Sequence, residues 1–381
     1  MTTAADHQAA LQSPALSTPF TQFNLATALA AYDELRSVVP LDEVWFAVKA
    51  APIPELIREL HRRGSAFDVA SAGEIDLCLA NGVPASRLRY GNPIRTPAEI
   101  AHGAAVGVTT WIVDTAEEVE RIAALAPHSR IVIRLASDGA GSDWPLSGKF
   151  GCAPAEARDI AHQAQALGLR AAGLSWHVGS QQRDVHGWDR ALRAAAHVWH
   201  ALHAEGITMD VLDLGGGWPG NGCYRSPAPP LADYAKPIIE TVDELWPHAR
   251  PVLVAEPGRS LVAAAGTSIV TVKAVATRPD GRTYVVVDGG VFNLGLVEAI
   301  GAVIEYRIEA LGYDADAPTQ PIVLCGPSCD SLDEIAARTP YHLAVGLQAG
   351  DRLAIYDVGS YSFSYAAQFF NGYLPAPLVL T

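Results

Sequence analysis

The sequence predicts a closed barrel of eight parallel strands surrounded by helices, followed by a second, mostly β domain. Apolar segments of strand length alternate with amphipathic segments of helix length over residues 26–258. The alternation repeats eight times in roughly 220 residues, which is the size of a parallel barrel. After about Arg259 the helical segments stop and strand-like segments follow one another.

Each expected barrel strand is a short run rich in aliphatic and aromatic residues. These runs are Val44–Val48, Ala66–Val69, Leu88–Gly91, Thr110–Val113, Arg130–Leu135, Gly173–Val178, Val211–Leu214 and Val252–Ala255. Between them, helices are expected at 54–64, 72–82, 115–126, 153–168 and 188–206. Several of these segments begin with Pro or an acidic first turn and end at Gly, as helices do.

The segment after the barrel has the pattern of a sheet. In "SLVAAAGTSIVTVKAVATRPDGRTYVVVDGG" two strands are expected on either side of a hairpin at "RPDGR", residues 278–282. "PIVLCG" and "DRLAIYDVG" continue in the same way without long helices. A further short strand is expected near the start of the chain, around Thr21–Leu25.

Composition limits the classes of partner. The chain has 381 residues, of which 49% are apolar, so two domains are expected. Its net charge of -14 disfavours nucleic acid and anionic membrane surfaces as partners. No signal peptide is visible, and no run approaches the ~20 apolar residues of a membrane helix. The five cysteines are odd in number and scattered, which indicates reduced thiols and a cytoplasmic protein.

Polar residues stand at or near the ends of the expected barrel strands. In chain order they are Lys49, Asp68, Arg134, His177, the glycines 215–217 and Glu256. Because the C-terminal ends of parallel barrel strands form one face, these residues are expected to lie together. Any one of them alone would fit a polar residue at a barrel rim, but the whole set indicates an active site.

The chemistry of this set points to a cofactor. Lys49 can form a Schiff base with an aldehyde. The backbone amides of "DLGGGWPG" could hold a phosphate group on the same cofactor. Arg259 in "AEPGRS" and Ser180 in "HVGSQ" could bind the same phosphate. Glu256 would face a cationic ring nitrogen, and His177 would lie against a flat ring. Together these groups describe pyridoxal phosphate.

Two other interpretations of the motifs are rejected. Gly215, Gly217 and Gly220 match the dinucleotide pattern G-x-G-x-x-G, but Pro219 and the following "NGCYRSPAPP" cannot form the helix that this motif needs. A metal site at His197, His200 and His203 is not expected, because successive steps of three residues drift by ~60° around a helix.

The chain resembles the fold-type III pyridoxal-phosphate decarboxylases, the group of eukaryotic-type ornithine decarboxylase and diaminopimelate decarboxylase. The matching motifs are "FAVKA", "FDVASAGEI", "KFG", "HVGSQ", "DLGGGWPG", "AEPGRSLV", "GPSCDSLD", "GSYS" and "FFNGY", which run from about residue 44 to 373. The resemblance implies a (β/α)8 barrel of the alanine-racemase type and a β domain that includes the N-terminal strand. The domains would then be 26–258 for the barrel, and 1–25 with 259–381 for the β domain.

The resemblance also implies roles for the barrel residues. Lys49 would carry the cofactor, Glu256 would keep its ring nitrogen protonated, and Arg134 would support Glu256. The other cofactor-binding residues would be Asp68, Glu74 and His177 around the ring, with Ser180, Gly216, Gly217, Gly258, Arg259 and Tyr361 at the phosphate.

Further residues are implied for the substrate. Cys329 would return a proton to Cα, and Asp330 would bind the distal ammonium of the substrate, both reaching the neighbouring site of a homodimer. Phe292 and Tyr361 would line the substrate site. The "CD" pair resembles that of ornithine decarboxylases, whereas diaminopimelate enzymes tend to carry Cys-Glu. A substrate with a single distal cation is therefore expected, namely ornithine, lysine or arginine, with ornithine or lysine as the first expectation.

Other functions stay open at this point. In "DGGVFNLGLVEAIGA" no Asp follows Phe292, which leaves the length and chirality of the substrate undetermined and allows diaminopimelate or a D-amino acid. Alanine racemase shares the architecture, but it places an arginine at the ring nitrogen, where this chain would have Glu256. A non-catalytic regulatory homologue would have lost cofactor residues, whereas Lys49 and Cys329 are both present.

Overall fold

The computed structural model describes residues 16–220 and 224–381. Within these residues the chain forms two compact units. Unit 1 holds the described parts of 1–30 and 222–227 together with Leu261–Thr381, and unit 2 holds those of 31–221 and 228–260. Residues 224–227 therefore lie outside the barrel, although the sequence analysis placed them inside its 26–258 range. Arg225 explains this position, because its guanidinium donates to the carbonyls of Thr339 and Pro340, the latter at 2.9 Å.

Unit 2 is the expected barrel. Neighbouring strands are parallel and close into a ring in the order β10 (Val211–Asp213), β11 (Val252–Ala255), β2 (Glu43–Ala47), β3 (Ala66–Val69), β4 (Leu88–Tyr90), β5 (Thr110–Val113), β6 (Arg130–Arg134) and β8 (Arg170–Ser175). Each observed strand overlaps one predicted segment. The prediction of a parallel barrel is confirmed.

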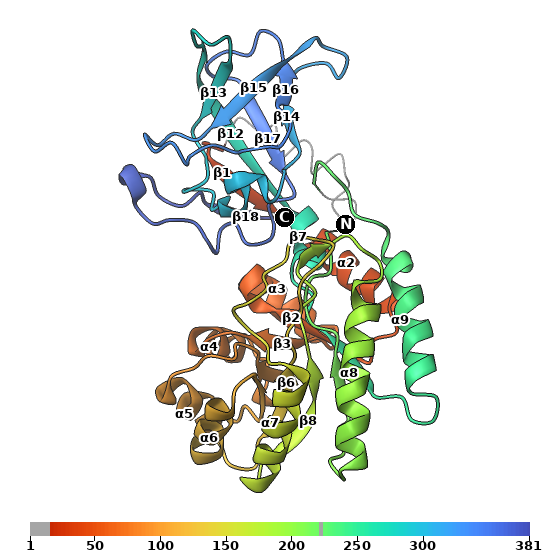
Figure 1. Cartoon of the computed structure of the whole chain (residues 1–381). Helices are drawn as coiled ribbons and strands as arrows, with labels where there is room; N and C mark the ends of the chain where they lie inside the picture. Colours follow the sequence, from red (N-terminus) through yellow and green to blue (C-terminus); the bar gives the residue numbers. More distant parts are fainter. Residues whose placement is uncertain (1–15, 221–223) are drawn as a thin grey trace. The chain divides into compact units, whose positions relative to one another are not determined.

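Helices lie on the outside of this barrel (Figure 1). They are α2 (Leu25–Val38), α3 (Pro54–Arg62), α4 (Ala72–Ala80), α5 (Pro97–Ala105), α6 (Ala116–Leu125), α7 (Pro154–Ala166), α8 (Gly187–Ala204) and α9 (Leu231–Leu245). A short helix, α10 (Arg259–Val262), follows β11. The sequence analysis did not name α2, α5 or α9. The start of α5 was readable, because Thr96 and Glu99 form a capping box and Pro97 follows the cap.

The two faces of the barrel strands carry different residues, because successive side chains of a strand point to opposite sides. The rings of Tyr90 and Trp111 stack with their centroids 5.6 Å apart, and the Tyr90 hydroxyl donates to Glu99 on α5. Arg89, next to Tyr90 on β4, therefore points into the barrel, where it is paired in register with Asp68. The interior of the barrel thus contains charged groups at its centre.

Unit 1 is a mixed sheet with the order β14 (Ile308–Ala310), β17 (Arg352–Tyr356), β12 (Gly266–Thr277), β13 (Thr283–Val287), β15 (Thr319–Cys325) and β16 (Tyr341–Ala344). The expected hairpin at 278–282 joins β12 to β13. The N-terminal strand β1 (Phe20–Phe23) pairs with β12 and with the C-terminal β18 (Leu378–Leu380), so it belongs to this sheet as expected. Val270, Val285 and Leu353 are among the buried residues of its core.

In the part of the chain that the structure describes, no helix has the length and apolarity needed to cross a bilayer.

Candidate active site

Lys49 follows β2 directly, in the 3-10 turn η1 (Val48–Ala50) at the C-terminal end of the barrel strands. Its Nζ donates a hydrogen bond to Asp68 Oδ2 at 2.9 Å, from the neighbouring strand β3. The Asp68 side chain is 2% exposed, whereas that of Lys49 is 46% exposed. A buried carboxylate therefore anchors the amine, and the amine remains accessible from the barrel mouth.

His177 follows β8 and is held in one orientation. The Gly179 N–H donates to its Nδ1 at 3.0 Å, so Nδ1 carries no proton and the neutral ring bears its hydrogen on Nε2. A Cβ on Gly216 would lie 2.9 Å from His177 Nε2, which requires glycine at this position. The ring is thus fixed against the glycine loop after β10.

The surroundings of His177 keep it uncharged. Burial, and then the positive charges of Arg134, Lys49 and Arg259, lower the pKa of His177 from 6.5 to about 3. These cations come from three different parts of the barrel, so their charges converge on the same region as the histidine. A neutral imidazole among cations suits a flat ring that carries an anionic phosphate.

The expected phosphate ligands also converge. Arg259 is almost fully buried, and its Nε and Nη2 donate to Ser180 Oγ at 3.3 and 3.2 Å. Gly217 has a φ of +101°, and a Cβ there would lie 2.3 Å from the Gly179 carbonyl oxygen. A guanidinium, a hydroxyl and a close-packed glycine loop form the donor set of an anion site.

Two buried tryptophans support this glycine loop through stacking and hydrogen bonds. Trp218 is 1% exposed and stacks on Trp188 at a centroid distance of 4.2 Å. Its Nε1 donates to the Gly215 carbonyl at 3.0 Å, while Trp188 Nε1 donates to the Leu214 carbonyl at 2.9 Å. The Gln182 N–H donates to the Gly217 carbonyl at 3.0 Å, which joins the two loops of the anion site.

The segment after β6 is tied to the same site. Its strand β7 (Ser142–Trp144) pairs with β9 (Ser180–Gln182), the strand that carries Ser180. Arg183 binds both carboxylate oxygens of Asp143, at 2.7 and 2.6 Å. A bidentate ion pair of this kind fixes both distance and angle. The loop and the anion site therefore form one connected structure.

Glu256 follows β11, and its partner differs from the expected one. The sequence analysis gave the supporting role to Arg134, whereas in the structure the guanidinium on Glu256 Oε1 is that of Arg89. Arg89 reaches it because β4 is in register with β3 and its middle residue points inward. The guanidinium of Arg134 instead lies 5.3 Å from the ring centroid of Phe150 in the "KFG" motif.

Arg89 was missed because it stands in the middle of a strand rather than at its end. A charged residue between the buried Leu88 and Tyr90 was nevertheless a usable signal. A buried guanidinium needs carboxylate partners, so it predicts acidic residues inside the barrel.

Glu74 and Gly258 are placed by local backbone structure. Glu74 Oε2 accepts from the Ala70 N–H at 2.7 Å, and Ser71 caps the helix α4 that carries it. Burial raises the pKa of Glu74 above 4.5, with opposing effects from the Ala70 hydrogen bond and Lys49. Gly258 lies between Glu256 and Arg259, where the chain leaves β11 for α10.

The remaining predicted residues belong to unit 1. Cys329 is exposed, and both its N–H and its Sγ lie within hydrogen-bond distance of Asn371 Oδ1, at 3.1 and 3.4 Å. The rings of Phe292 and Phe370 are 4.4 Å apart. The structure thus brings the "GPSCD", "VFN" and "FFNGY" segments together, and it adds Asn371 as a contact that the sequence analysis did not foresee.

A second unforeseen residue, Asp333, holds this group in place. It is 3% exposed and accepts hydrogen bonds from the Val291 and Ser328 N–H groups at 2.8 and 2.9 Å. Asp330, three residues earlier, accepts from the Leu332 N–H at 2.9 Å. Tyr361 has a φ of +52°, and its ring lies 6.0 Å from that of Tyr365.

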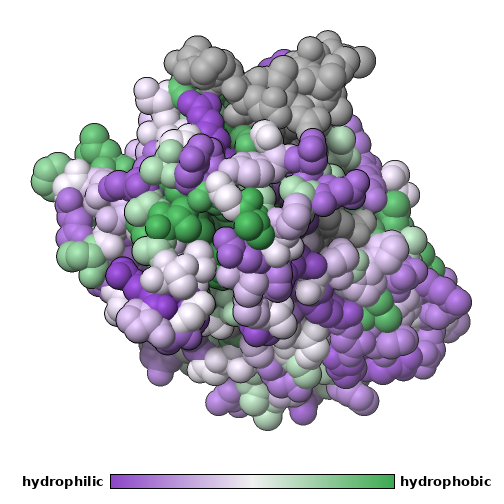
Figure 2. Space-filling view, turned by 90° about the horizontal axis from the view of Figure 1, so that it is seen from above, coloured by the Kyte–Doolittle hydropathy of each residue, from purple (hydrophilic) through white to green (hydrophobic). Residues whose placement is uncertain are grey.

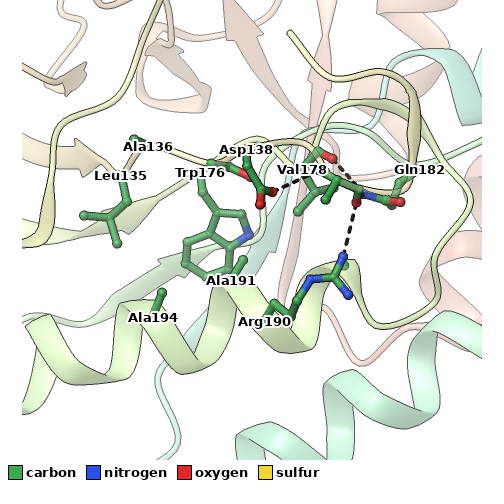
Figure 3. A pocket seen from close by; sticks show the side chains of 12 residues that line it. Leu135, Ala136, Asp138, Trp176, Val178, Gln182, Arg190, Ala191 and Ala194 are labelled. Atoms are coloured by element: carbon green, nitrogen blue, oxygen red, sulfur yellow. Dashed lines mark hydrogen bonds between the residues drawn. The ribbon is translucent and has the colours of Figure 1, made fainter. Parts of the chain in front are cut away.

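A separate cavity of about 240 Å³ lies between the loop after β6 and helix α8 (Figure 3). Trp176 and Val178 line it, and both Gln182 and Arg190 donate to the Ala140 carbonyl beside it, at 3.1 and 3.2 Å. His177, between Trp176 and Val178, lies instead against the glycine loop. The cavity and the cofactor residues therefore occupy opposite sides of the segment 176–178.

The comparison with protein families decides the class. Residues 25–263 match the family described as pyridoxal-dependent decarboxylase, pyridoxal binding domain. The chain belongs to the pyridoxal-dependent decarboxylases. Its cofactor is pyridoxal phosphate.

Relatives of this decarboxylase cover nearly the whole chain. A lysine/ornithine decarboxylase of Selenomonas ruminantium is 30% identical over 95% of this chain and 89% of its own. An ornithine decarboxylase of Caenorhabditis elegans is 32% identical over 89% of this chain and 82% of its own. The crystal structure of a lysine/ornithine decarboxylase from Vibrio vulnificus, complexed with putrescine, is 29% identical, covers 100% of this chain and 99% of its own, and has a TM-score of 0.87.

The decarboxylase has the residues that this cofactor requires. Lys49 would supply the amine, and Arg259 with Ser180 and the glycine loop would supply an anion cradle that a Cβ would fill. Glu256 supplies an acid near the barrel mouth, with its side chain 15% exposed. The donor set therefore fits pyridoxal phosphate.

The lowered pKa of His177 predicts a pH effect on the stability of the apoprotein. Since this pKa is about 3 in the fold against 6.5 ordinarily, the unfolded chain takes up a proton below pH 6.5 that the folded chain does not. His177 therefore costs no stability above pH 6.5, and stability is lost as the pH falls from 6.5 toward 3, by at most about 1.4 kcal/mol per pH unit. His177→Gln should remove this part of the dependence in urea unfolding measured from pH 7.5 to 5.

The exposed His203→Gln is the control and should follow the wild-type dependence. If the free energy of unfolding changes with pH equally in His177→Gln and wild type, His177 is not held neutral in the fold.

Proposed function

We propose that this decarboxylase converts ornithine or lysine to the corresponding diamine and CO2. The convergence of Lys49, His177, Glu256 and Arg259 at one end of the barrel carries the proposal. The names of its relatives support the substrate class, because the Selenomonas and Vibrio proteins are both lysine/ornithine decarboxylases.

Each barrel residue has a definable task. When bound, pyridoxal phosphate supplies an electron sink for the electron pair left on Cα as CO2 departs. Lys49 attaches the cofactor through its amine, and Asp68 orients that amine. The neutral His177 would lie against the ring of the bound cofactor without adding positive charge to it. Glu256 holds a proton at the ring nitrogen.

The phosphate end is held by fixed donors. Arg259 and Ser180 bind it together with the backbone amides around Gly216, Gly217 and Gly258, and Tyr361 is proposed as a further ligand. Because Trp218 and Gln182 already fix the glycine loop, little ordering remains for binding to impose.

The substrate side of the site needs a proton donor for Cα and a negative charge for the distal ammonium of the substrate. Cys329 is proposed to return a proton to Cα, and Asp330 to pair with the distal ammonium of the substrate. An unpaired ammonium in a desolvated pocket costs several kcal/mol, so a carboxylate there selects basic substrates. Phe292, packed on Phe370, would form an apolar wall beside the substrate chain.

We propose that two chains form a homodimer in which each provides Cys329 and Asp330 to its partner's site. Unit 1 offers apolar surface next to these residues: Leu332, Phe369 and Leu374 are 54%, 68% and 63% exposed. Phe369 is in the same motif as Asn371, which contacts Cys329. Figure 2 shows hydrophobic residues gathered between hydrophilic ones on one face of the molecule. Exposed apolar groups of this kind favour association.

A cytoplasmic location is part of the proposal. Cys78, Cys152, Cys325 and Cys329 all carry free thiols, which suits a reducing compartment.

The substrate assignment predicts selective release of CO2. The purified enzyme should act on L-ornithine and L-lysine in preference to L-arginine, diaminopimelate and the D-forms of the same amino acids. The measurement is kcat/KM for CO2 release from each compound. A preference for diaminopimelate or a D-amino acid would overturn the substrate while leaving the reaction class intact.

Asp330 should govern this preference. Asp330→Ala is expected to lower kcat/KM for ornithine and lysine by the equivalent of about 2–5 kcal/mol, because the distal ammonium loses its partner. Ser331→Ala, the next residue, serves as the control. An equal loss in both variants would speak against a role for the Asp330 carboxylate.

Lys49 should be the attachment point of the cofactor. Treatment of the loaded enzyme with sodium borohydride is expected to fix a pyridoxyl group on the peptide that contains Lys49, detected by mass spectrometry. The exposed Lys236 provides an internal control and should stay unmodified. Label on another lysine would refute the cofactor assignment.

Mixed dimers test whether sites are shared. Lys49→Ala and Cys329→Ala should each be nearly inactive alone. In a mixed dimer both lesions fall in one site and the other site is intact, so random exchange should restore about a quarter of wild-type activity. If exchange is demonstrated and no activity returns, Cys329 serves the site of its own chain or none.

A further inference from the structure

Arg89 has an unusual position for an arginine. It is the middle residue of β4, its side chain is 2% exposed, and it points into the barrel rather than toward the helices. Its guanidinium carbon lies 4.9 Å from the ring centroid of Trp45 on β2. The cation is therefore at the base of the active site, away from solvent.

Three carboxylates surround this guanidinium. Arg89 Nη1 is 2.6 Å from Asp213 Oδ2, Nη2 is in contact with Glu256 Oε1, and Nε is 3.8 Å from Asp68 Oδ1. The carboxylates come from β10, from the end of β11 and from β3. One guanidinium thus links three strands of the barrel through three nitrogen atoms.

Each of these carboxylates is connected to a different part of the site. Asp68 accepts from Lys49 through its other oxygen. Asp213 Oδ1 accepts from the Gly215 N–H at 2.9 Å, at the start of the glycine loop. Glu256 takes its ion pair with Arg89 on Oε1, which leaves Oε2 for the cofactor.

The charges require this arrangement. Asp213 is fully buried, and burial raises its pKa above 3.8 while Arg89 opposes that change. Like charges at close range disfavour ionisation, so three neighbouring carboxylates without Arg89 would bind a proton more readily. A protonated Glu256 would lose the charge that holds a proton on a ring nitrogen.

We propose that Arg89 is a positioning residue for Glu256. It keeps this carboxylate ionised and fixes Oε1, so that Oε2 serves the ring nitrogen of the cofactor. Its benefit to the reaction rests on the proposed function, whereas its effect on the ionisation of Glu256 is a property of the protein alone.

The decisive measurement is the titration of Glu256 in the apoprotein. Glutamate labelled with ¹³C at the side-chain carboxyl reports ionisation by NMR, and the signal lost in Glu256→Gln identifies the residue. An opposite charge within a few ångströms typically lowers the titration midpoint of a carboxylate by about 1–3 pH units. Removal of Arg89 should therefore move the midpoint of Glu256 upward by about 1–3 units.

Two variants of Arg89 are chosen so that each is expected to fold. Arg89→Leu combined with Asp213→Asn removes one buried charge of each sign, so no additional unpaired charge is left behind. Its Glu256 midpoint is compared with that of Asp213→Asn alone, because the loss of the Asp213 charge by itself lowers the midpoint. Arg89→Lys keeps the charge as a single point that cannot reach all three carboxylates, and it should shift the midpoint by a smaller amount, about half a unit. Thermal unfolding establishes that each variant is folded.

Arg95→Lys is the matched control. Arg95 is another buried arginine of this barrel, and it pairs with Glu118 on α6 at 3.1 Å. It should change stability without moving the Glu256 midpoint. An unchanged midpoint in the folded Arg89 variants, or an equal shift in Arg95→Lys, would overturn the proposal.

The loaded enzyme provides a second readout. The acid limb of the pH profile of kcat should also move upward, with KM little changed, and Arg89→Lys should restore most of the wild-type profile. If the wild-type enzyme releases no CO2 from any substrate, the proposed function fails while the titration still decides the role of Arg89. An upward midpoint without an upward shift of the kcat profile would refute the positioning role.

Discussion

The structure of the site depends on one buried guanidinium that holds three carboxylates together. Carboxylates are seldom buried unless they are paired, and Asp68, Asp213 and Glu256 all point into the same barrel. Arg89 makes this possible, and through these partners it reaches the lysine and the glycine loop. The charged interior of the barrel thus allows Asp68, the partner of Lys49, and Glu256 to share one buried guanidinium.

Around this charged centre, packing provides the rigidity. The stacked Trp218 and Trp188 support the glycine loop, and β7 with β9 connects the long loop after β6 to Ser180. Of these residues, Trp188, Trp218 and those of β7 are not among the proposed ligands of the cofactor. An anion site of this kind is formed before the phosphate arrives, so that binding energy is available for orienting the reacting groups.

Strand periodicity and motif spacing predicted the barrel, its eight strands and most of the residues at its mouth. The role given to Arg134 stays a prediction, whereas Arg89, the guanidinium in contact with Glu256, was missed because it stands inside a strand and not at a strand end where functional residues are sought. Asn371 and Asp333 could not be predicted either. Their roles arise from tertiary contacts between the "GPSCD", "VFN" and "FFNGY" segments, which are far apart in the sequence.

The pairing of β1 with β18 has a consequence for how the chain is made. The strand Phe20–Phe23 emerges from the ribosome before its neighbours β12 and β18, which follow roughly 240 and 350 residues later. At about 5–20 residues per second, β1 waits roughly 20–70 s for its last partner. During that time the unpaired edges of a strand with a phenylalanine at each end are available to other nascent chains or to chaperones. Efficient production of this enzyme therefore depends on what shields a four-residue strand while the barrel is being synthesised.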